Sequence, residues 1–317
     1  MSLTNLSANQ IHYQVIPGGE TIGLKVNTGV QIVGKYEVLT KTGKISPWKD
    51  SDIFENDKII AINNQKINNN QELLDILKLS SNEIELTLER NKQIINTKIN
   101  IVITKDNEKS LGLYIKDKII GIGTMTFIDP INNRFASLGH GIYEDDELIK
   151  TNKGTIVNSK IQSIKKAMPG TAGEKRASLL SNNLGNISLC SDTGIYGKIK
   201  SINDFKKDLI STSVQEEVKK GTAYFYTVID NQNIQKYKIE ITDVFLQTNC
   251  SPKGIKFKVV DTQLIKETGG IVQGMSGSPI VQDNKLIGAV SHVNVENPLI
   301  GYGIHIEWML KDIEKVA

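Results

Sequence analysis

The sequence predicts a mainly β protein with two domains. Short segments of alternating apolar and polar residues recur along the chain, as at 21–38, where Asn27-Thr28-Gly29 is a turn signal between two runs. The 317 residues are enough for two domains, each with its own core. Many short strands separated by turns are typical of β-barrels and sandwiches. Helices are expected in three segments: 69–80, 201–211 and 306–316.

The expected domain organisation follows from changes in this pattern. Residues 1–10 are polar and are expected to form a loose tail. Residues 11–103 combine predicted strands with one short amphipathic helix, which is about the content of one small domain. A charged connector, 104–110, leads into the second domain, 104–317, in which almost every predicted element is a short strand.

The composition is that of a soluble globular protein, with 39% hydrophobic and 23% charged residues. The formal net charge of +3 arises from nearly balanced charges, which gives no reason to expect a nucleic-acid partner. The four histidines lack metal-ligand spacing, and Cys190 and Cys250 lie far apart, so we expect neither a metal nor another cofactor. No long apolar run predicts a membrane span, and the N-terminal segment lacks the apolar core of a signal peptide.

The segment GGIVQGMSGSPIVQ, residues 269–282, places two serines among glycines and a proline. A serine hydroxyl becomes an effective nucleophile only with a base that takes its proton and donors that stabilise the oxyanion. Gly274 would let its own N–H and that of Ser276 point at one spot, and Gly277 would leave room for a substrate. The residues that follow predict a β-hairpin, a rigid support for such a turn. The alternative is an ordinary Gly/Ser turn between two strands.

His140 is the candidate base. It lies in FASLGHGIYEDDE between two glycines, which pack it poorly and favour an exposed or site-facing role. The other histidines are weaker candidates, because His12 lies in the first domain, His292 lies on the hairpin behind the serine, and His305 is expected to be satisfied near the sheet. A histidine base in turn needs a carboxylate that fixes its tautomer and stabilises its positive form.

Candidates for this carboxylate between His140 and Ser276 include Asp145, Asp146, Asp192, Asp243 and Asp261. The first two lie in an acidic loop and are expected to be solvated. Asp243 and Asp261 each end a strand pattern, which would suit a carboxylate that meets the histidine, and spacing alone does not separate them. The ordinary role for Asp261 would be to cap the segment TQLIKE.

The serine segment, with its hairpin, resembles the nucleophile segment of chymotrypsin-like peptidases. In addition, FASLGHGI, MPGTAGEKRA, TGGIVQGMSGSPI and GYGIHIEWML occur in an order that closely resembles the stage IV sporulation protein B peptidases of endospore-forming bacteria. This resemblance covers nearly the whole chain and implies a small PDZ domain followed by a chymotrypsin-like double β-barrel serine peptidase domain. It implies a triad of His140, Asp261 and Ser276, and an oxyanion hole formed by the N–H groups of Gly274 and Ser276. We expect Ser278 to line the site.

For the first domain, the resemblance implies the PDZ peptide-binding mode, in which an apolar-Gly-apolar loop binds a peptide carboxylate through backbone N–H groups. The segment NNQELLDIL would be the helix that lines the groove. Asn56 and Asn64 stand where the family has glycines, and both residues tolerate left-handed backbone. The residues that fit the carboxylate-binding loop are Thr21, Ile22, Gly23 and Leu24.

The resemblance also implies a biological role. Such peptidases are made in the forespore, exported across its inner membrane, and cleave a membrane-associated partner between the two membranes, which signals activation of a late mother-cell sigma factor. They also cleave themselves under control of the PDZ domain, whose ligand is therefore a peptide that can belong to the same chain. Family members begin with a membrane-targeting segment, so we expect this chain to be the soluble part of a membrane-anchored protein.

Two other interpretations compete with the serine endopeptidase. One is a catalytically silent scaffold whose PDZ groove binds peptides in the same sporulation compartment. All three implied triad positions are filled, which favours the enzyme. The other is a housekeeping PDZ protease for unfolded proteins, but such proteins usually place the protease domain first, which is the reverse of the order here.

Overall fold

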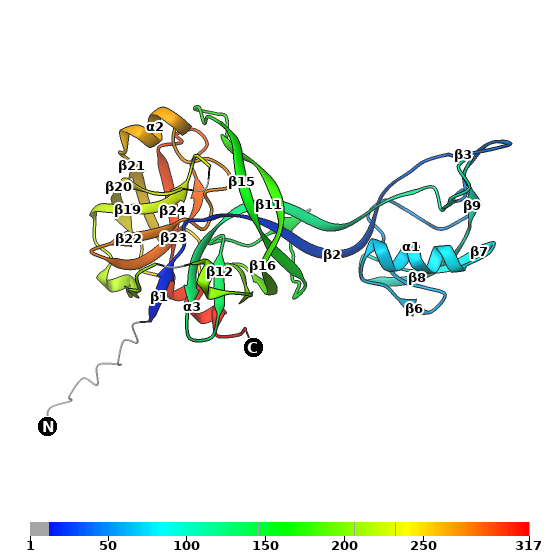
Figure 1. Ribbon diagram of the computed structural model, residues 1–317, viewed down its shortest axis with the longest axis horizontal. Coiled ribbons are helices and arrows are strands. Elements are labelled where there is room, and N and C mark those ends of the chain that lie inside the picture. Colours follow the sequence, from blue (N-terminus) through cyan, green and yellow to red (C-terminus); the bar gives the residue numbers. More distant parts are fainter. Residues whose placement is uncertain (1–12, 145, 206, 232, 317) are drawn as a thin grey trace, which may run out of the picture. The chain divides into compact units, whose positions relative to one another are not determined.

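The computed structural model describes residues 13–144, 146–205, 207–231 and 233–316 (Figure 1). The predicted tail at 1–10 and the candidate Asp145 therefore lie outside the described residues. The chain forms two compact units. The small unit is Asn27–Ile119, and the larger unit combines the residues up to Val26 with those from Ile120 onward.

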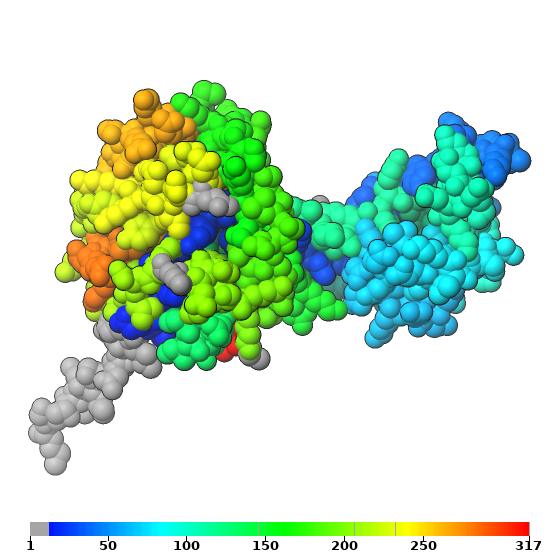
Figure 2. Space-filling view, in the orientation of Figure 1, coloured from blue at the N-terminus to red at the C-terminus, as the bar shows by residue number. Residues whose placement is uncertain are grey.

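These units correct the predicted boundary of the first domain, which was 11–103. The small unit begins and ends later, because β1 (Gln14–Pro17) and the first part of β2 (Thr21–Lys35) pair with strands of the larger unit. In Figure 2, blue atoms of this N-terminal segment lie among green and yellow atoms of the larger unit. The small unit is thus inserted in the chain between β2 and β11 (Leu113–Asp129), two strands that contribute residues to both units.

The larger unit contains a first closed cycle of paired strands. Its order is β2, β15, β16, β17, β12 and β11, and β11 pairs again with β2. Alternate residues point inward and form one core, which includes Ile22, Leu24, Met125, Phe135 and Ile156. The strands not yet bounded are β12 (Arg134–Ser137), β15 (Gly154–Lys165), β16 (Glu174–Ser191), β17 (Gly194–Ile199) and the short pair β13 (Tyr143–Glu144) and β14 (Glu147–Leu148).

A second closed cycle follows in the order β19, β20, β21, β24, β23 and β22, with β22 paired back to β19. Its core includes Phe225, Tyr237, Ile239, Phe257 and Ile280. The predicted mainly β fold is confirmed, and two closed cycles agree with a double β-barrel. The strands are β18 (Ile210–Thr212), β19 (Gly221–Val228), β20 (Ile234–Val244), β21 (Ile255–Val259), β22 (Pro279–Gln282), β23 (Lys285–Val293) and β24 (Ile300–His305).

The helices of the larger unit are short. α3 (Ile306–Ile313) confirms the helix predicted near the C-terminus and packs Met309 and Leu310 into a third apolar cluster. α2 (Thr262–Thr268) contains the segment TQLIKE, which the sequence analysis raised only in the alternative role of Asp261 as a cap. The predicted helix at 201–211 is wrong: the structure has only a 3-10 turn at Ile202–Asp204, and β18 begins at Ile210. A second 3-10 turn covers Gln215–Glu217.

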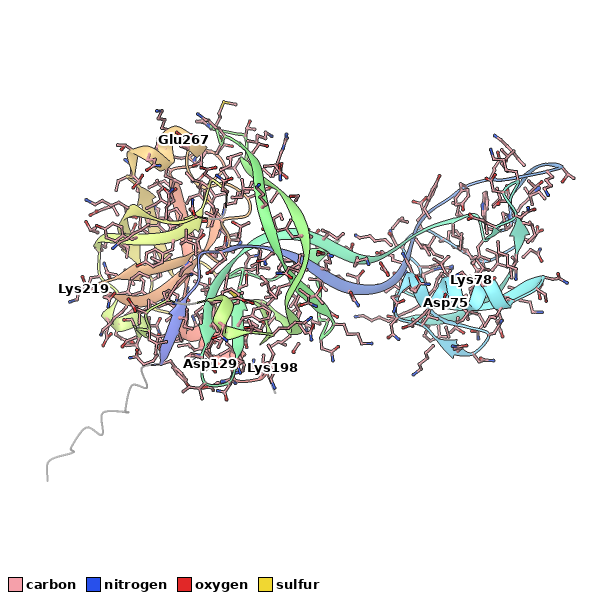
Figure 3. All side chains as sticks on the ribbon, viewed as in Figure 1. Asp75, Lys78, Asp129, Lys198, Lys219 and Glu267 are labelled. Carbon is pink, nitrogen blue, oxygen red and sulfur yellow. The ribbon has the colours of Figure 1, made fainter. Side chains whose placement is uncertain are left out.

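The small unit packs α1 (Asn70–Leu79) on a sheet. The predicted helix is confirmed: Asn69 caps it by accepting from the Glu72 N–H at 2.9 Å, Leu73 and Leu77 are buried, and Asp75 and Lys78 form an exposed ion pair (Figure 3). The strands are β3 (Val38–Thr40), β4 (Gly43–Ile45), β5 (Lys58–Ile62), β6 (Gln65–Lys66), β7 (Glu83–Arg90), β8 (Gln93–Asn100), β9 (Val102–Ile103) and β10 (Lys109–Ser110).

Backbone conformation in the small unit agrees with one detail of the sequence analysis. Asn56 and Asn64, which stand where the family has glycines, have φ angles of 72° and 64°. Both residues therefore adopt the left-handed conformation for which they were expected to be suited. The assignment of this unit to the PDZ fold stays a prediction.

One buried ion pair stabilises the small unit, and its removal should measurably lower the free energy of unfolding. Asp57 is fully buried and accepts from Arg90 Nε at 2.6 Å, from Arg90 Nη2 at 2.8 Å and from the Phe54 N–H at 2.8 Å. Asp57→Ala should lower the free energy of unfolding of this unit by about 3 kcal/mol, because it removes the buried charge partner of Arg90 and leaves Arg90 Nε and the Phe54 N–H without this acceptor. Trp48 fluorescence in a Trp308→Phe background, followed in urea, measures it.

Asp52→Ala is the matched control, because exposed Asp52 accepts from the same arginine at 3.1 Å. Its loss should stay below about 1 kcal/mol. Equal losses for the two variants would contradict the assigned role of the buried pair.

Candidate active site

Ser276 lies in the turn that precedes β22, and hydrogen bonds from β11 hold that turn, two from Thr124 and one from the Thr126 hydroxyl to the Gly277 carbonyl at 2.8 Å. The Thr124 N–H donates to the Ser276 carbonyl at 2.9 Å, and the Thr124 hydroxyl donates to the Gly274 carbonyl at 2.7 Å. The serine side chain itself is partly exposed. A strand of the first barrel therefore sets the position of the candidate nucleophile, although that residue belongs to the second barrel.

Gly277 shows how closely the turn meets the first barrel. It has φ 90°, and a Cβ added there would lie 2.2 Å from the Thr124 carbonyl oxygen and 2.5 Å from the Leu138 nitrogen. Its N–H donates to the Val290 carbonyl at 2.7 Å. Only glycine fits this position, and the contact with Leu138 brings the turn next to the loop that carries His140.

The backbone N–H groups of the turn fall into two sets. Met275 donates to the Val272 carbonyl at 3.1 Å and Ser278 donates to the Met275 carbonyl at 2.9 Å. Within the described residues, no acceptor is recorded for the N–H groups of Gly274 and Ser276. Gly274 has φ 92°, a conformation that glycine adopts readily. The two predicted oxyanion donors are thus the ones that remain able to bind an external oxygen.

Ser278 does not line the site. Its side chain is fully buried, as is that of Met275, so the prediction that Ser278 faces a substrate is wrong. Its hydroxyl has no hydrogen-bond partner among the described residues. Ser278 directly precedes β22, which is buried at all four positions, so its side chain lies with the core of the second barrel.

His140 follows β12 in a loop where Leu138 and Gly139 have φ angles of 80° and 71°. Its Nδ1 lies 2.7 Å from the Gly141 carbonyl oxygen, so Nδ1 carries the proton and Nε2 is left as the acceptor. Burial lowers the pKa of His140, and the hydrogen bond to Gly141 acts in the opposite direction. The ring is therefore neutral at neutral pH, as a general base must be.

A second histidine faces the first. The rings of His292, in β23, and His140 have centroids 5.6 Å apart. Burial, followed by the nearby His140, lowers the pKa of His292 to about 4. No hydrogen bond between His140 and Ser276 is recorded among the described residues, and the two residues approach through the contact of Gly277 with Leu138.

A cavity of about 640 Å³ opens beside His140. It contains two carboxylates, Asp192 and Asp312, together with apolar and basic side chains. The residues that line it are His140, Gly141, Tyr143, Ser191, Asp192, Thr193, Cys250, Pro252, His292, Trp308, Lys311, Asp312 and Lys315.

Neither Ser276 nor Asp261, the predicted third member of the triad, is among the residues that line this cavity. Asp261 caps α2: Oδ1 accepts from the Leu264 N–H at 3.0 Å and Oδ2 accepts from the Lys238 N–H at 3.2 Å. No contact between Asp261 and His140 is recorded in the described part of the chain. The structure thus shows Asp261 in the alternative role as a helix cap, and its catalytic role stays a prediction. Asp243 instead pairs with Lys220 at 3.0 Å.

The predicted carboxylate-binding loop, Thr21 to Leu24, is also corrected. These residues lie inside β2, in the larger unit, and Ile22, Gly23 and Leu24 pair with Asn158, Val157 and Ile156 of β15. Ile22 and Leu24 are buried in the core of the first barrel. The alternation that was interpreted as a loop motif is that of a continuous strand, whose backbone groups are already paired.

Sequence reasoning assigned no role to Lys175, which lies beneath the serine turn. Its side chain is only 2% exposed, and Nζ donates to the hydroxyls of Thr227 at 2.7 Å and Thr21 at 3.2 Å. Its N–H donates to the Gln273 carbonyl at 2.9 Å, and its Cβ and Cδ lie 3.2 Å from the position of a Cβ on Gly274. Burial lowers the pKa of Lys175 to about 7. The segment MPGTAGEKRA was the one sequence signal near it.

Two further searches cover the described residues only. In that part of the chain, no three His, Cys, Asp or Glu side chains are grouped so that they could hold a metal ion. None of the described helices has the length and apolar character needed to cross a membrane.

Comparison with known proteins places the chain in a family. The family model for SpoIVB peptidase S55 matches residues 107–310. The chain belongs to the SpoIVB peptidase S55 family. The matched range contains both His140 and Ser276, so both candidate residues lie in the part of the chain that carries the peptidase signature.

The chain is also similar to a more distant protein that has a different name. A Helicobacter pylori (strain J99) protein named "Putative zinc metalloprotease" is 27% identical over 163 residues. The match covers 49% of this chain and 44% of that protein, so it spans less than half of the relative's length.

Lys175 predicts a pH dependence of stability. Below pH 7 the lysine is charged in both folded and unfolded chains, whereas above pH 7 the folded protein has lost a proton that the unfolded chain retains up to about pH 10. The wild-type free energy of unfolding should therefore rise relative to that of Lys175→Met by about 2 kcal/mol between pH 7 and pH 9. Urea unfolding at the two pH values measures this.

The control for loss of a positive charge is Lys198→Met, on the neighbouring strand β17 (Figure 3). Parallel pH profiles for the wild type and Lys175→Met would rule out the titration of this lysine.

Proposed function

We propose that the chain is a serine endopeptidase in which Ser276 is the nucleophile and His140 the general base. The observation that carries this proposal is the serine turn itself. Its Gly274 and Ser276 N–H groups have no acceptor among the residues that the structure describes, and Gly277 packs against the loop that holds His140. Membership of a peptidase family supports the same activity.

The chemistry follows from these positions. Nε2 of His140 takes the hydroxyl proton as Ser276 Oγ attacks the peptide carbonyl carbon, and the carbonyl oxygen becomes negative. The N–H groups of Gly274 and Ser276 then donate to that oxygen, which stabilises the tetrahedral intermediate. The imidazolium returns the proton to the leaving amine, and water hydrolyses the acyl-enzyme by the same steps.

The proposed biological role is that of a sporulation signalling peptidase. Membership of the SpoIVB peptidase family supports a substrate that is a membrane-associated partner protein, and self-cleavage as a second reaction. We propose export from the forespore to the space between its two membranes, and a peptide-binding role for the small unit. Incubation of the purified protein with candidate membrane proteins of the sporulating cell, followed by sequencing of new N-termini, tests the substrate assignment.

Ser276→Ala should abolish reaction with a fluorophosphonate and any self-cleavage, because no other hydroxyl occupies its position. Mass spectrometry of the labelled protein locates the adduct. Ser278→Ala is the matched control: it lies two residues away, is buried, and should keep labelling. If the wild type and Ser276→Ala behave alike, the protein is instead the catalytically silent scaffold.

The lowered pKa of His140 predicts the pH dependence of that reaction. A base must be neutral to act, so the rate of labelling should stay high as the pH falls to the ordinary histidine value of about 6.5, and should decline only below it. Rate constants measured between pH 5 and pH 8 test this. An inflection above pH 7 would show that burial does not control the titration of the base.

A further inference from the structure

We propose that Lys175 is a positioning residue that directs the Gly274 N–H toward the oxyanion. The proposal rests on the function proposed above and gives a side chain of the first barrel a part in the oxyanion hole of the second. Gly274 does not fix this direction by itself, because glycine adopts φ angles of either sign about equally readily. A restraint from elsewhere in the chain is therefore needed.

The direction of the Gly274 N–H follows from the carbonyl that shares its peptide unit. A trans peptide unit is planar, and its C=O and N–H point in opposite directions. The Gly274 N–H shares its unit with the Gln273 carbonyl, which accepts from the Lys175 N–H at 2.9 Å. The Gln273 N–H donates to the Gly173 carbonyl, also at 2.9 Å. These two bonds hold the Gln273 carbonyl against the start of β16 and direct the Gly274 N–H away from it.

The second oxyanion donor is set in the same way, but from within the turn. The Ser276 N–H shares its peptide unit with the Met275 carbonyl, which accepts from the Ser278 N–H at 2.9 Å. That bond joins near neighbours in sequence, whereas the bond to the Gln273 carbonyl comes from a strand of the other barrel. The direction of the Gly274 donor therefore depends on how the start of β16 is held.

The side chain of Lys175 connects this end of β16 to both barrels. Its stem passes next to Gly274, with Cβ and Cδ 3.2 Å from the position of a Cβ on that glycine. Nζ then donates to the Thr227 hydroxyl of β19 at 2.7 Å and to the Thr21 hydroxyl of β2 at 3.2 Å. The two threonines are buried as well.

A residue needed only for packing would not carry this amine. In the described part of the chain no carboxylate is bonded to Nζ, and burial of an amine without one is unfavourable. Methionine would fill the same space without that cost. The amine is thus explained by the two hydroxyl groups that it ties together beneath the oxyanion donor.

Loss of the amine would release the stem and, with it, the Lys175 N–H from its place against Gln273. The peptide unit between Gln273 and Gly274 could then rotate, and the Gly274 N–H would no longer meet the substrate oxygen. Lys175 does not touch the reacting atoms, so it acts through Gly274.

The test is the labelling kinetics of Lys175→Met in the full chain, with a fluorophosphonate whose phosphoryl oxygen occupies the oxyanion hole. Methionine keeps an apolar stem and removes the amine. The maximal rate constant should fall about 10²-fold, the loss expected when a donor moves by about 1 Å, and the half-saturating reagent concentration should not change. The phosphorus NMR signal of the labelled protein should also shift, because the phosphoryl oxygen loses one hydrogen bond.

Lys207→Met is the matched control. Lys207 Nζ donates to the Pro17 and Gly18 carbonyls at 3.1 Å, and no contact with the serine turn is recorded for it among the described residues. This variant should label at the wild-type rate, and thermal unfolding verifies that each variant is folded. A folded Lys175→Met with the wild-type rate constant overturns the proposal.

Thr227→Val and Thr227→Ser decide the question if Lys175→Met does not fold. Valine removes the nearer hydroxyl partner of Nζ and should slow labelling, whereas serine keeps that hydroxyl and should label at the wild-type rate. Equal rates for these two variants would overturn the proposal. Failure of the wild type to label, or labelling that survives Ser276→Ala, would instead contradict the serine peptidase itself.

Discussion

The pair of hydrogen bonds from Thr124 to the serine turn is the constraint on which the candidate site depends. His140 lies in the first barrel and Ser276 in the second, so the proposed chemistry would need both barrels. Thr124 holds the turn by its hydrogen bonds. Gly277 has no side chain, so the turn can lie directly against Leu138 in the loop that carries His140. A nucleophile that rests on paired strands keeps its geometry better than one held by a free loop.

Asp261 and Asp192 show how the surroundings of a carboxylate decide which of its oxygens are paired. Asp261 begins a helix whose unpaired N–H groups would otherwise be unsatisfied, and both of its oxygens are used there. Asp192 lies between Ser191 and Thr193, whose hydroxyls both donate to Asp312. The Asp192 side chain is exposed, and its Oδ1 accepts from the Tyr143 hydroxyl. Both oxygens of the capping aspartate are therefore paired with backbone N–H groups, whereas the aspartate in the turn is exposed.

Burial around the serine turn has a second consequence. Lys175 lies under Gly274 with hydroxyl partners and no carboxylate recorded against it, and the loss of hydration brings its pKa to about 7. The same closely packed region buries Ser278 and Met275. The turn therefore has a closely packed base, and two of its N–H groups have no acceptor among the described residues.

The sequence by itself determined the mainly β fold, the helix at α1, the left-handed Asn56 and Asn64, and the two residues on which the proposed chemistry rests, His140 and Ser276. These follow from local rules: alternation, caps, turn residues and a glycine-rich nucleophile segment. The tertiary structure was needed to show that residues 21–24 continue a barrel strand and that Asp261 caps a helix. Both features depend on the pairing of strands that are far apart in the chain, and a local sequence pattern does not indicate which strands will pair.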